Sequence, residues 1–437
     1  MNRINKITIW FAFLSIILAA CQPTATPFPS TKPAEAAKTA ATAVPQEITL
    51  TIWDQFSSGS ESVDKIYKNF NAKNPNIKIK REIYSTDQLN TVARTALASG
   101  TGPDIVYLDV TPARELIDAG LLLALDPYID QYKLKDRFLS DQLNWGLHKG
   151  KIYGLSNEAE FTGVFFNKSL LDKDGISIPN TMAEALDMCK KAKEKGKVGF
   201  SLALNSSMGF FMYNMPLTNI AGKDWIENII FKEQGRWDSP ESIKALDTVY
   251  KDMKNAGCFI EDANALNFAG AADHFINEKS YAIAVGTWLV SRIMEMSKTK
   301  EIVLAPWFDM GTGKPRLYNM GCGSAWYISA KSKFPDAAAK FLDYSYSDEA
   351  VKIWIEEVGI IPPVKQDITK LNVPPIQKVV LEQLYTARGG FSWHIDLFVP
   401  LAFNQANRAG QQELFSGKKT SEQLAKELQA QWEARKK

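Results

Sequence analysis

Apolar residues recur along this chain with two periods, one typical of strands and one typical of helices. Ile48–Trp53 predicts a strand, and the next apolar positions form one face of a helix: Val63, Ile66, Tyr67 and Phe70. That helix is expected to end near Asn74-Pro75, before a strand over 77–83 and a helix over 87–99. Ile105–Leu108 is apolar throughout, which is typical of a parallel strand covered on both faces.

A similar alternation restarts after a longer segment that contains Pro127 and Gly146. The predicted elements are strands Val164–Phe166, Gly199–Ala203 and Tyr281–Val285, and helices Thr181–Lys195, Ser239–Ala256 and Asn267–Asn277. One sheet of this size is unusual, so we predict an α/β chain of two domains.

The N-terminus has the pattern of an export signal. Arg3 and Lys6 precede the apolar run Ile7–Leu18, which is shorter than the roughly 20 residues that span a bilayer. The sequence Leu18-Ala19-Ala20-Cys21 resembles a bacterial lipoprotein signal, so residues 1–20 are read as a cleaved peptide and Cys21 as the lipidated residue. The alternative is an anchoring N-terminal helix. Residues 21–46 are rich in Pro, Thr, Ala and Ser and predict a disordered tether.

Charge and cysteine content narrow the possibilities further. Without residues 1–20 the number of Lys and Arg falls from 51 to 49 and equals the 49 Asp and Glu, which argues against nucleic-acid binding. Cys189, Cys258 and Cys322 remain besides Cys21, with no metal-ligand spacing. Cys189 shares a helix face with apolar residues, so we expect a small buried side chain there. A Cys189–Cys258 disulfide cannot be read from the sequence.

Five segments carry a resemblance to a known family. They are Thr95–Asp109, Gly150–Leu155 with Phe165–Lys168, Phe275–Trp288, Ala337–Leu342 with Ser347–Glu349, and Leu414–Thr420 with Leu424, Leu428 and Trp432. In this order they resemble family 1 extracellular solute-binding proteins, the maltose-binding-protein-like group. The resemblance covers essentially all of the chain after the tether.

The resemblance implies a two-lobed periplasmic-binding-protein-like α/β fold with three inter-domain crossings and a central ligand cleft. Lobe 1 is expected at 47–157 plus 287–341, and lobe 2 at 158–286 plus 342–437, with hinges near Leu155, Val285 and Tyr344. It also implies an extracytoplasmic, membrane-anchored monomer that passes a mono- or oligosaccharide to the permease of an ABC transporter. It implies neither a cofactor nor a metal.

Acidic residues at strand ends are the first candidate ligand contacts, because carboxylates accept hydrogen bonds from sugar hydroxyls. Asp54 and Gln55 follow the first strand and Asp109 the third, at one edge if the sheet is parallel. Helix capping is the alternative for both aspartates. Glu158 and Glu160 lie at the first expected crossing, where a solvated charge or an inter-lobe salt bridge is the alternative.

Aromatic side chains are the second group of candidates, because a sugar ring packs on a flat aromatic face. Trp288, at the second expected crossing, is the strongest, with core packing as the alternative. The resemblance also points to Phe211, Tyr213, Trp393 and Asp396. Gly323 is a further candidate because a glycine lets backbone amides approach a ligand, although a turn also explains it.

Enzymatic motifs are missing from the sequence: it has no GxSxG, HExxH or GxxxxGK[ST], and three histidines, His148, His274 and His394. We therefore predict a binding protein without catalysis. Two alternatives stay open. Acids and aromatics could enclose a polyamine or another cationic amine, and Asp54, Asp109, Glu158 and Glu160 could supply the two carboxylates of a glycoside hydrolase.

Overall fold

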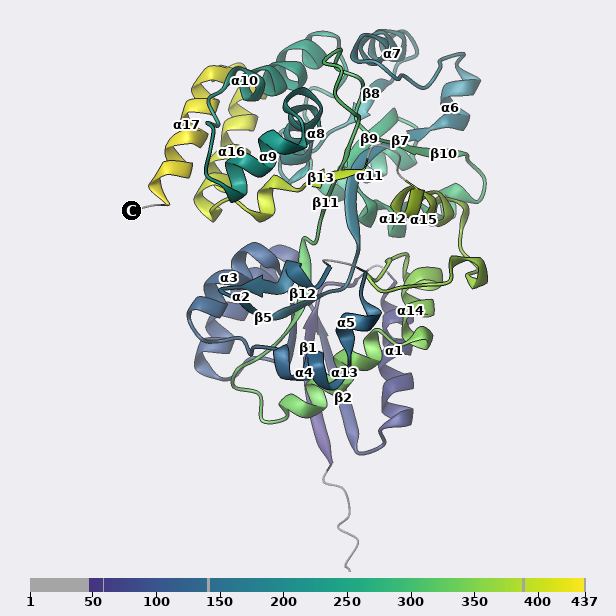
Figure 1. The fold of residues 1–437 in the computed structure, drawn as a ribbon. Coiled ribbons are helices and arrows are strands. Elements are labelled where there is room, and N and C mark those ends of the chain that lie inside the picture. The colour runs from purple at the N-terminus through teal and green to yellow at the C-terminus, as the bar shows by residue number, and fades with distance from the viewer. Residues whose placement is uncertain (1–46, 58, 140–141, 387–389, 436–437) are drawn as a thin grey trace, which may run out of the picture. The chain divides into compact units, whose positions relative to one another are not determined.

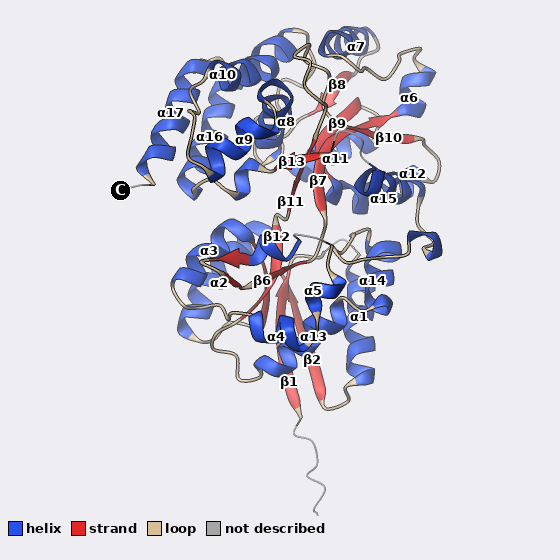
Figure 2. Ribbon diagram, viewed as in Figure 1, coloured by secondary structure: helices blue, strands red, loops and turns tan. Residues whose placement is uncertain are grey.

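A computed structural model describes residues 47–57, 59–139, 142–386 and 390–435. Two β-sheets organise this part of the chain, and helices cover both (Figures 1 and 2). We call the first sheet with its helices lobe 1 and the second lobe 2. The predicted signal, tether and Cys21 lie outside the described residues. Within the described residues, no helix is long and apolar enough to cross a membrane.

Lobe 1 is built on five strands in the order β2-β1-β3-β12-β6. Their bounds are β1 Ile48–Asp54, β2 Ile77–Ile83, β3 Ile105–Asp109, β6 Gly154–Ser156 and β12 Ser324–Ile328. The first three are parallel, as predicted, and β12 runs antiparallel to β3 and β6. Ile105 and Tyr107 pack in one apolar cluster and Val106 and Leu108 in another, so both faces of β3 are buried.

The helices of lobe 1 come from both ends of its sequence. They are α1 Ser60–Lys73, α2 Thr86–Ser99, α3 Val110–Asp118, α4 Asp126–Gln131, α5 Leu134–Arg137, α13 Pro335–Ser345 and α14 Asp348–Ile353. The buried residues of α1 are the four whose spacing predicted it: Val63, Ile66, Tyr67 and Phe70. A small hairpin of β4 Leu147–His148 and β5 Lys151–Ile152 follows the 3₁₀ turn Gln142–Gly146.

Lobe 2 is built on a mixed sheet in the order β13-β11-β7-β9-β8, with β10 also paired to β7. Its strands are β7 Glu160–Asn167, β8 Val198–Ser201, β9 Ser280–Gly286, β10 Ile302–Ala305, β11 Tyr318–Gly321 and β13 Phe391–Trp393. Its helices are α6 Lys168–Lys173, α7 Met182–Glu194, α8 Met208–Ala221, α9 Lys223–Phe231, α10 Pro240–Asp247, α11 Phe268–Ile276, α12 Val290–Ser297, α15 Pro375–Thr386, α16 Leu401–Phe415 and α17 Ser421–Ala434.

The chain passes between the sheets three times, as predicted, but two of the passages lie elsewhere. The first is at 157–159, between β6 and β7, which agrees with the expected boundary. The second lies between β11 and β12, at Cys322 and Gly323, because β10 and β11 pair with β7 of lobe 2. The third lies between 359 and 374, since α13 and α14 pack against α1.

The predicted bounds 287–341 and 342–437 are therefore wrong for these elements. The predicted hinges Val285 and Tyr344 are wrong as well, because they lie inside β9 and α13. Leu155 lies in β6, next to the first crossing. The pairing of β10 and β11 with a strand more than 100 residues earlier is non-local, so no periodicity along the chain reports it.

Cys189 on α7 forms a disulfide with Cys258, and Cys322 is free and buried. The predicted burial of Cys189 is confirmed, and the structure forms the disulfide that the sequence left open. Gly199 of β8 makes room for it, since a Cβ there would lie 2.5 Å from the Cys189 sulfur.

Candidate functional site

The first two crossings are joined by hydrogen bonds around Gly323. Its amide nitrogen donates to Glu160 Oε2 (2.8 Å), and its carbonyl accepts from the amide of Val110 (2.9 Å). A Cβ at this position would lie 2.9 Å from Glu160 Oε2. The next residue, Ser324, donates its hydroxyl to Asp109 Oδ1 (2.7 Å). Glu160 at the start of β7 and Asp109 at the end of β3 are thereby held on either side of one short segment.

Four of the predicted carboxylates gather at this junction, and we call them the acid cluster: Asp109, Glu158, Glu160 and Asp396. Burial raises the pKa of Glu160 well above its usual value, and the negative charges of the other three raise it further. The hydrogen bond from the Gly323 amide partly offsets this rise. The cluster brings together residues of β3, the first crossing, β7 and the turn after β13, so it includes residues of both lobes.

Burial also raises the pKa of Glu158 to about 8 and that of Asp396 to about 7. Glu158 accepts a hydrogen bond from the Thr287 hydroxyl at 3.3 Å, which partly offsets the effect of burial. Oδ1 of Asp396 is buried and makes no hydrogen bond within the protein. Near neutral pH Glu158 is mostly protonated and Asp396 is partly protonated, so the cluster can both donate and accept hydrogen bonds.

Lobe 1 contributes Asp109 to the acid cluster, and Gln55 borders the cluster from the same lobe. Asp109 accepts a further hydrogen bond from Asn90 Nδ2 of α2 (2.8 Å). It occupies the N-cap position of α3, but its side chain makes no capping bond, so the capping alternative is wrong. The amide of Gln55 lies 3.5 Å from the Ser324 hydroxyl.

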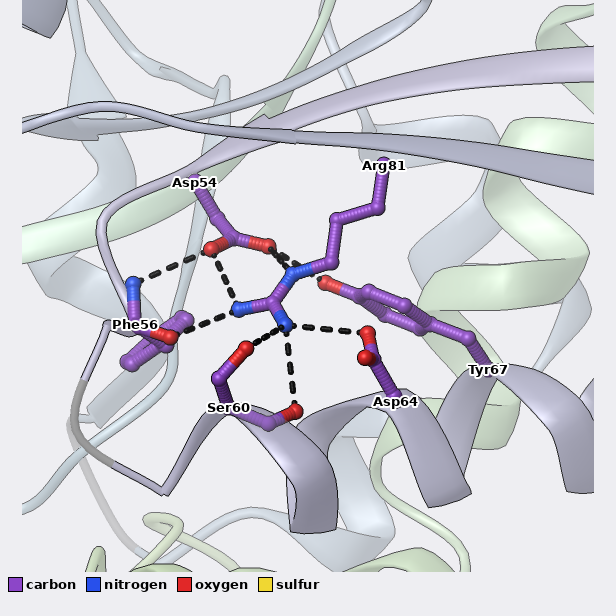
Figure 3. Close-up of polar contacts among 6 residues, drawn as sticks. All are labelled: Asp54, Phe56, Ser60, Asp64, Tyr67 and Arg81. Carbon is purple, nitrogen blue, oxygen red and sulfur yellow. Dashed lines mark hydrogen bonds and ion pairs between the residues drawn. The ribbon is translucent and has the colours of Figure 1, made fainter.

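Asp54, by contrast, belongs to a closed network inside lobe 1 (Figure 3). Arg81 of β2 binds both of its oxygens, Nε to Oδ2 at 2.7 Å and Nη2 to Oδ1 at 2.8 Å. The Tyr67 hydroxyl and the Phe56 amide donate to the same carboxylate at 2.8 and 3.0 Å. Because Asp54 is fully buried and both oxygens are occupied, its prediction as a ligand contact is wrong.

Aromatic rings adjoin the acid cluster from lobe 2. Trp288 is partly exposed and follows Thr287, and its ring covers Gly286, where a Cβ would lie 1.9 Å from the ring. Phe211 of α8 packs against it with ring centroids 5.2 Å apart, and His394 lies 5.6 Å from Phe211. Burial lowers the pKa of His394 to about 3, so this histidine is neutral. Two of the candidate aromatics, Trp288 and Phe211, thus lie together.

Two other predicted aromatics have different positions. Tyr213 is fully buried in the core of lobe 2, where its hydroxyl lies 2.6 Å from Ser242 Oγ, so its prediction as a ligand contact is wrong. Trp393 is partly exposed and donates Nε1 to Glu227 at 3.0 Å. Its ring contacts Trp145 of lobe 1 at 5.7 Å and Phe231 of α9 at 5.4 Å.

Several residues of the junction have no predicted role, namely Asn90, Trp145, Thr287 and Ser324. Ser324 directly follows the candidate Gly323, and Asn90 lies within the helix predicted over 87–99. Their contacts with Asp109 span 215 and 19 residues, and no local pattern reports the longer of them. Thr287 could have been found, because it directly precedes Trp288 at the end of a predicted strand.

Comparison with known proteins identifies the family. The family model for bacterial extracellular solute-binding proteins matches residues 65–371. The multiple sugar-binding protein of Streptococcus mutans is 25% identical over 362 residues, 80% of this chain and 83% of that protein. The arabinooligosaccharide-binding protein of Bacillus subtilis is 24% identical over 324 residues, 70% of this chain and 72% of that protein.

Solved structures share the fold at low identity. One, described in work on xylan utilisation by Caldanaerobius polysaccharolyticus, has a TM-score of 0.80 and 24% identity and covers 88% of this chain and 99% of its own. A chitin oligosaccharide binding protein has a TM-score of 0.78 and 22% identity, and the match covers 90% of this chain and 100% of that protein. The two-lobed periplasmic-binding-protein-like fold is confirmed, and the chain belongs to the family of bacterial extracellular solute-binding proteins.

Proposed function

We propose that this protein captures a carbohydrate between its lobes and delivers it to the permease of an ABC transporter, without catalysis and without a cofactor. The observation that carries the proposal is the meeting of carboxylates from both lobes beside a partly exposed tryptophan, Trp288. The proposed contacts are Gln55, Asp109, Glu158, Glu160, Phe211, Trp288, Gly323 and Asp396, with Trp393 at the edge.

The chemistry of this group suits a sugar. Carboxyl groups exchange hydrogen bonds with vicinal hydroxyls, and an aromatic face packs on the C–H face of a pyranose. A ligand favours closure only through its differential affinity for the closed state, which requires contacts from both lobes. The names of the relatives from S. mutans and B. subtilis, which refer to sugars, support the same ligand class.

We further propose that residues 1–20 are a signal peptide, that Cys21 carries a lipid, and that residues 22–46 tether a monomer to the outer face of the cell membrane. The family is extracellular, which supports this location. Cys21→Ser removes the thiol that accepts the lipid, so the variant should leave the detergent phase in a partitioning assay. A variant that partitions like the parent would contradict the lipid assignment.

A cationic amine is the second candidate ligand, because several carboxyl groups gather beside aromatic rings that can make cation–π contacts. A thermal-shift panel of neutral saccharides and polyamines separates the two, since a ligand that binds only the native state stabilises by RT ln(1 + [L]/Kd). We expect a saccharide to raise the transition temperature and to be recovered unchanged after prolonged incubation. Stabilisation by amines alone would replace the proposed ligand, and hydrolysis of the saccharide would restore the glycosidase alternative.

A further inference from the structure

One segment of lobe 2 reaches across the junction and docks on lobe 1. We call residues Trp393–Phe398 the latch turn. Leu397 in this turn is buried and belongs to the apolar cluster of lobe 1, which also contains Leu108, Leu116 and Ala325. A leucine of one lobe therefore completes the core of the other.

Hydrogen bonds from α3 of lobe 1 hold the backbone of the same turn. Arg114 Nη1 donates to the carbonyl of Leu397 at 2.7 Å, and the Thr111 hydroxyl donates to the carbonyl of Asp396 at 3.4 Å. A guanidinium donor makes a stronger bond to a carbonyl than a neutral donor does, because the bond is charge-assisted. Arg114 is thus the main polar contact from α3 to the latch turn.

Aromatic rings add a third contact across the junction. Trp145, in the 3₁₀ turn of lobe 1, lies 5.7 Å from the ring of Trp393 and 5.7 Å from that of Phe398. The first pair is edge-to-face and the second is tilted, and such pairs each contribute beyond the area they bury. The latch turn is therefore held by lobe 1 at both of its ends.

Hydrogen bonds also fix the latch turn to its own lobe. The contacts that lobe 1 makes with this turn therefore hold lobe 2 as a whole. The buried Asn214 of α8 accepts a hydrogen bond from the Ile395 amide at 3.0 Å, and Asn404 of α16 donates to the Asp396 carbonyl at 2.9 Å. Asp396, a member of the acid cluster, thus lies between the residues that Arg114 and Trp145 contact.

From these contacts we propose that Arg114 is a positioning residue that latches the two lobes together before any ligand binds, and that it holds Asp396 at the acid cluster. All of these contacts join lobe 1 directly to the latch turn of lobe 2, so they favour the arrangement in which the lobes are docked, which we identify with the closed state. The apparent dissociation constant is the intrinsic one divided by the fraction of competent protein. The latch therefore changes the apparent dissociation constants of all ligands by the same factor. This statement about affinity rests on the proposed function.

The test compares Arg114→Ala and Arg114→Lys with the matched control Arg94→Ala, in the chain without residues 1–46. Arg94 of α2 forms its ion pair with Glu115, inside lobe 1. Small-angle scattering without ligand should give a larger radius of gyration for Arg114→Ala alone. Calorimetry with saccharides identified by the panel should show one common loss of affinity, about five-fold if closure falls from half to one tenth of the molecules. Arg114→Lys should recover part of both.

The scattering and calorimetry results test different parts of the proposal. An unchanged ligand-free radius in Arg114→Ala overturns the latch, whatever the ligand. A larger radius with unchanged affinity shows that the latch does not set affinity, and a loss confined to one saccharide makes Arg114 a ligand contact instead. If no saccharide binds the parent protein, the proposed function fails, but the scattering comparison still tests the latch. Far-ultraviolet circular dichroism and the thermal transition check that each variant folds. If Arg114→Ala does not fold, Arg114→Lys takes its place in the comparison.

Discussion

Asp54 and Glu160 are both buried carboxylates at the end of a strand, yet their surroundings are opposite. Asp54 ends β1 and is bound on both oxygens by the guanidinium of Arg81, whose side chain is only 8% exposed. Glu160 begins β7, and burial and the negative charges of three neighbouring carboxylates raise its pKa. The first carboxylate is compensated within the protein. The second keeps a need for hydrogen-bond partners that a ligand can meet.

A position at the end of a strand therefore does not identify a binding residue. The charges of the neighbouring side chains distinguish the two carboxylates. Burial lowers the pKa of Arg81, but its bonds to Asp54 outweigh burial and leave the pKa raised, so the guanidinium stays charged. A fully bonded ion pair stabilises one geometry. A cluster of like charges with raised pKa values is typical of sites where proteins bind or react.

The largest expected effect comes from breaking the compensated side. Arg81→Ala leaves Asp54 buried without its cation, and we expect a loss of about 3–5 kcal/mol in the free energy of unfolding. Urea denaturation measures it. Lys80→Ala is the matched control, because Lys80 is 65% exposed and pairs with Glu82 at the surface. A loss no larger than that of the control would contradict the central role of the Asp54 network.

The uncompensated side should respond to pH instead. The pKa of Glu158 is raised from 4.5 to about 8, so the folded protein binds more protons than the unfolded chain between these values. The associated stability is fully present below pH 4.5 and is lost as pH rises through about 8. Glu158→Gln keeps the shape and removes the titration, so its unfolding free energy should depend less on pH in this window. If the unfolding free energies of variant and parent depend equally on pH, burial does not raise the pKa of Glu158.

The sequence predicted much of the fold because its signals are local. The helix face from Val63 to Phe70, the parallel strands β1 to β3 and the first crossing agree with the structure. The second and third crossings were misplaced because strand order depends on pairing between distant segments. Asp54 was misassigned for the same reason: its partner Arg81 lies 27 residues away. The sequence signal for this partner was Arg81 itself, a charged residue between Ile79 and Ile83 in a predicted strand.

Among the aromatics, Trp288 should matter for binding. Trp288→Ala removes a ring that is partly exposed beside the acid cluster, and we expect ligand affinity to fall by about 1–3 kcal/mol with the fold intact. Titration calorimetry measures this loss. Trp225→Ala is the control, because Trp225 packs on Trp237 inside lobe 2. If Trp288→Ala lowers the thermal transition but not the affinity, Trp288 is a core residue.

The smallest expected effect separates core from site. Tyr213→Phe removes the hydroxyl that bonds Ser242, which should cost about 1 kcal/mol of stability. Ligand affinity should stay unchanged, because Tyr213 is fully buried away from the acid cluster. Chemical denaturation and calorimetry together check both statements. A clear loss of affinity would restore Tyr213 to the site.

The disulfide between Cys189 and Cys258 bears on where lobe 2 matures. Such bonds form and persist in oxidising compartments and are rare in the reducing cytosol. The bond closes a loop of 69 residues, a constraint on the unfolded chain of about 4 kcal/mol in the loop-entropy account. Before export, lobe 2 lacks this contribution. The family is extracellular, so the bond forms after the chain leaves the reducing cytosol and stabilises lobe 2 in the compartment where the ligand is met.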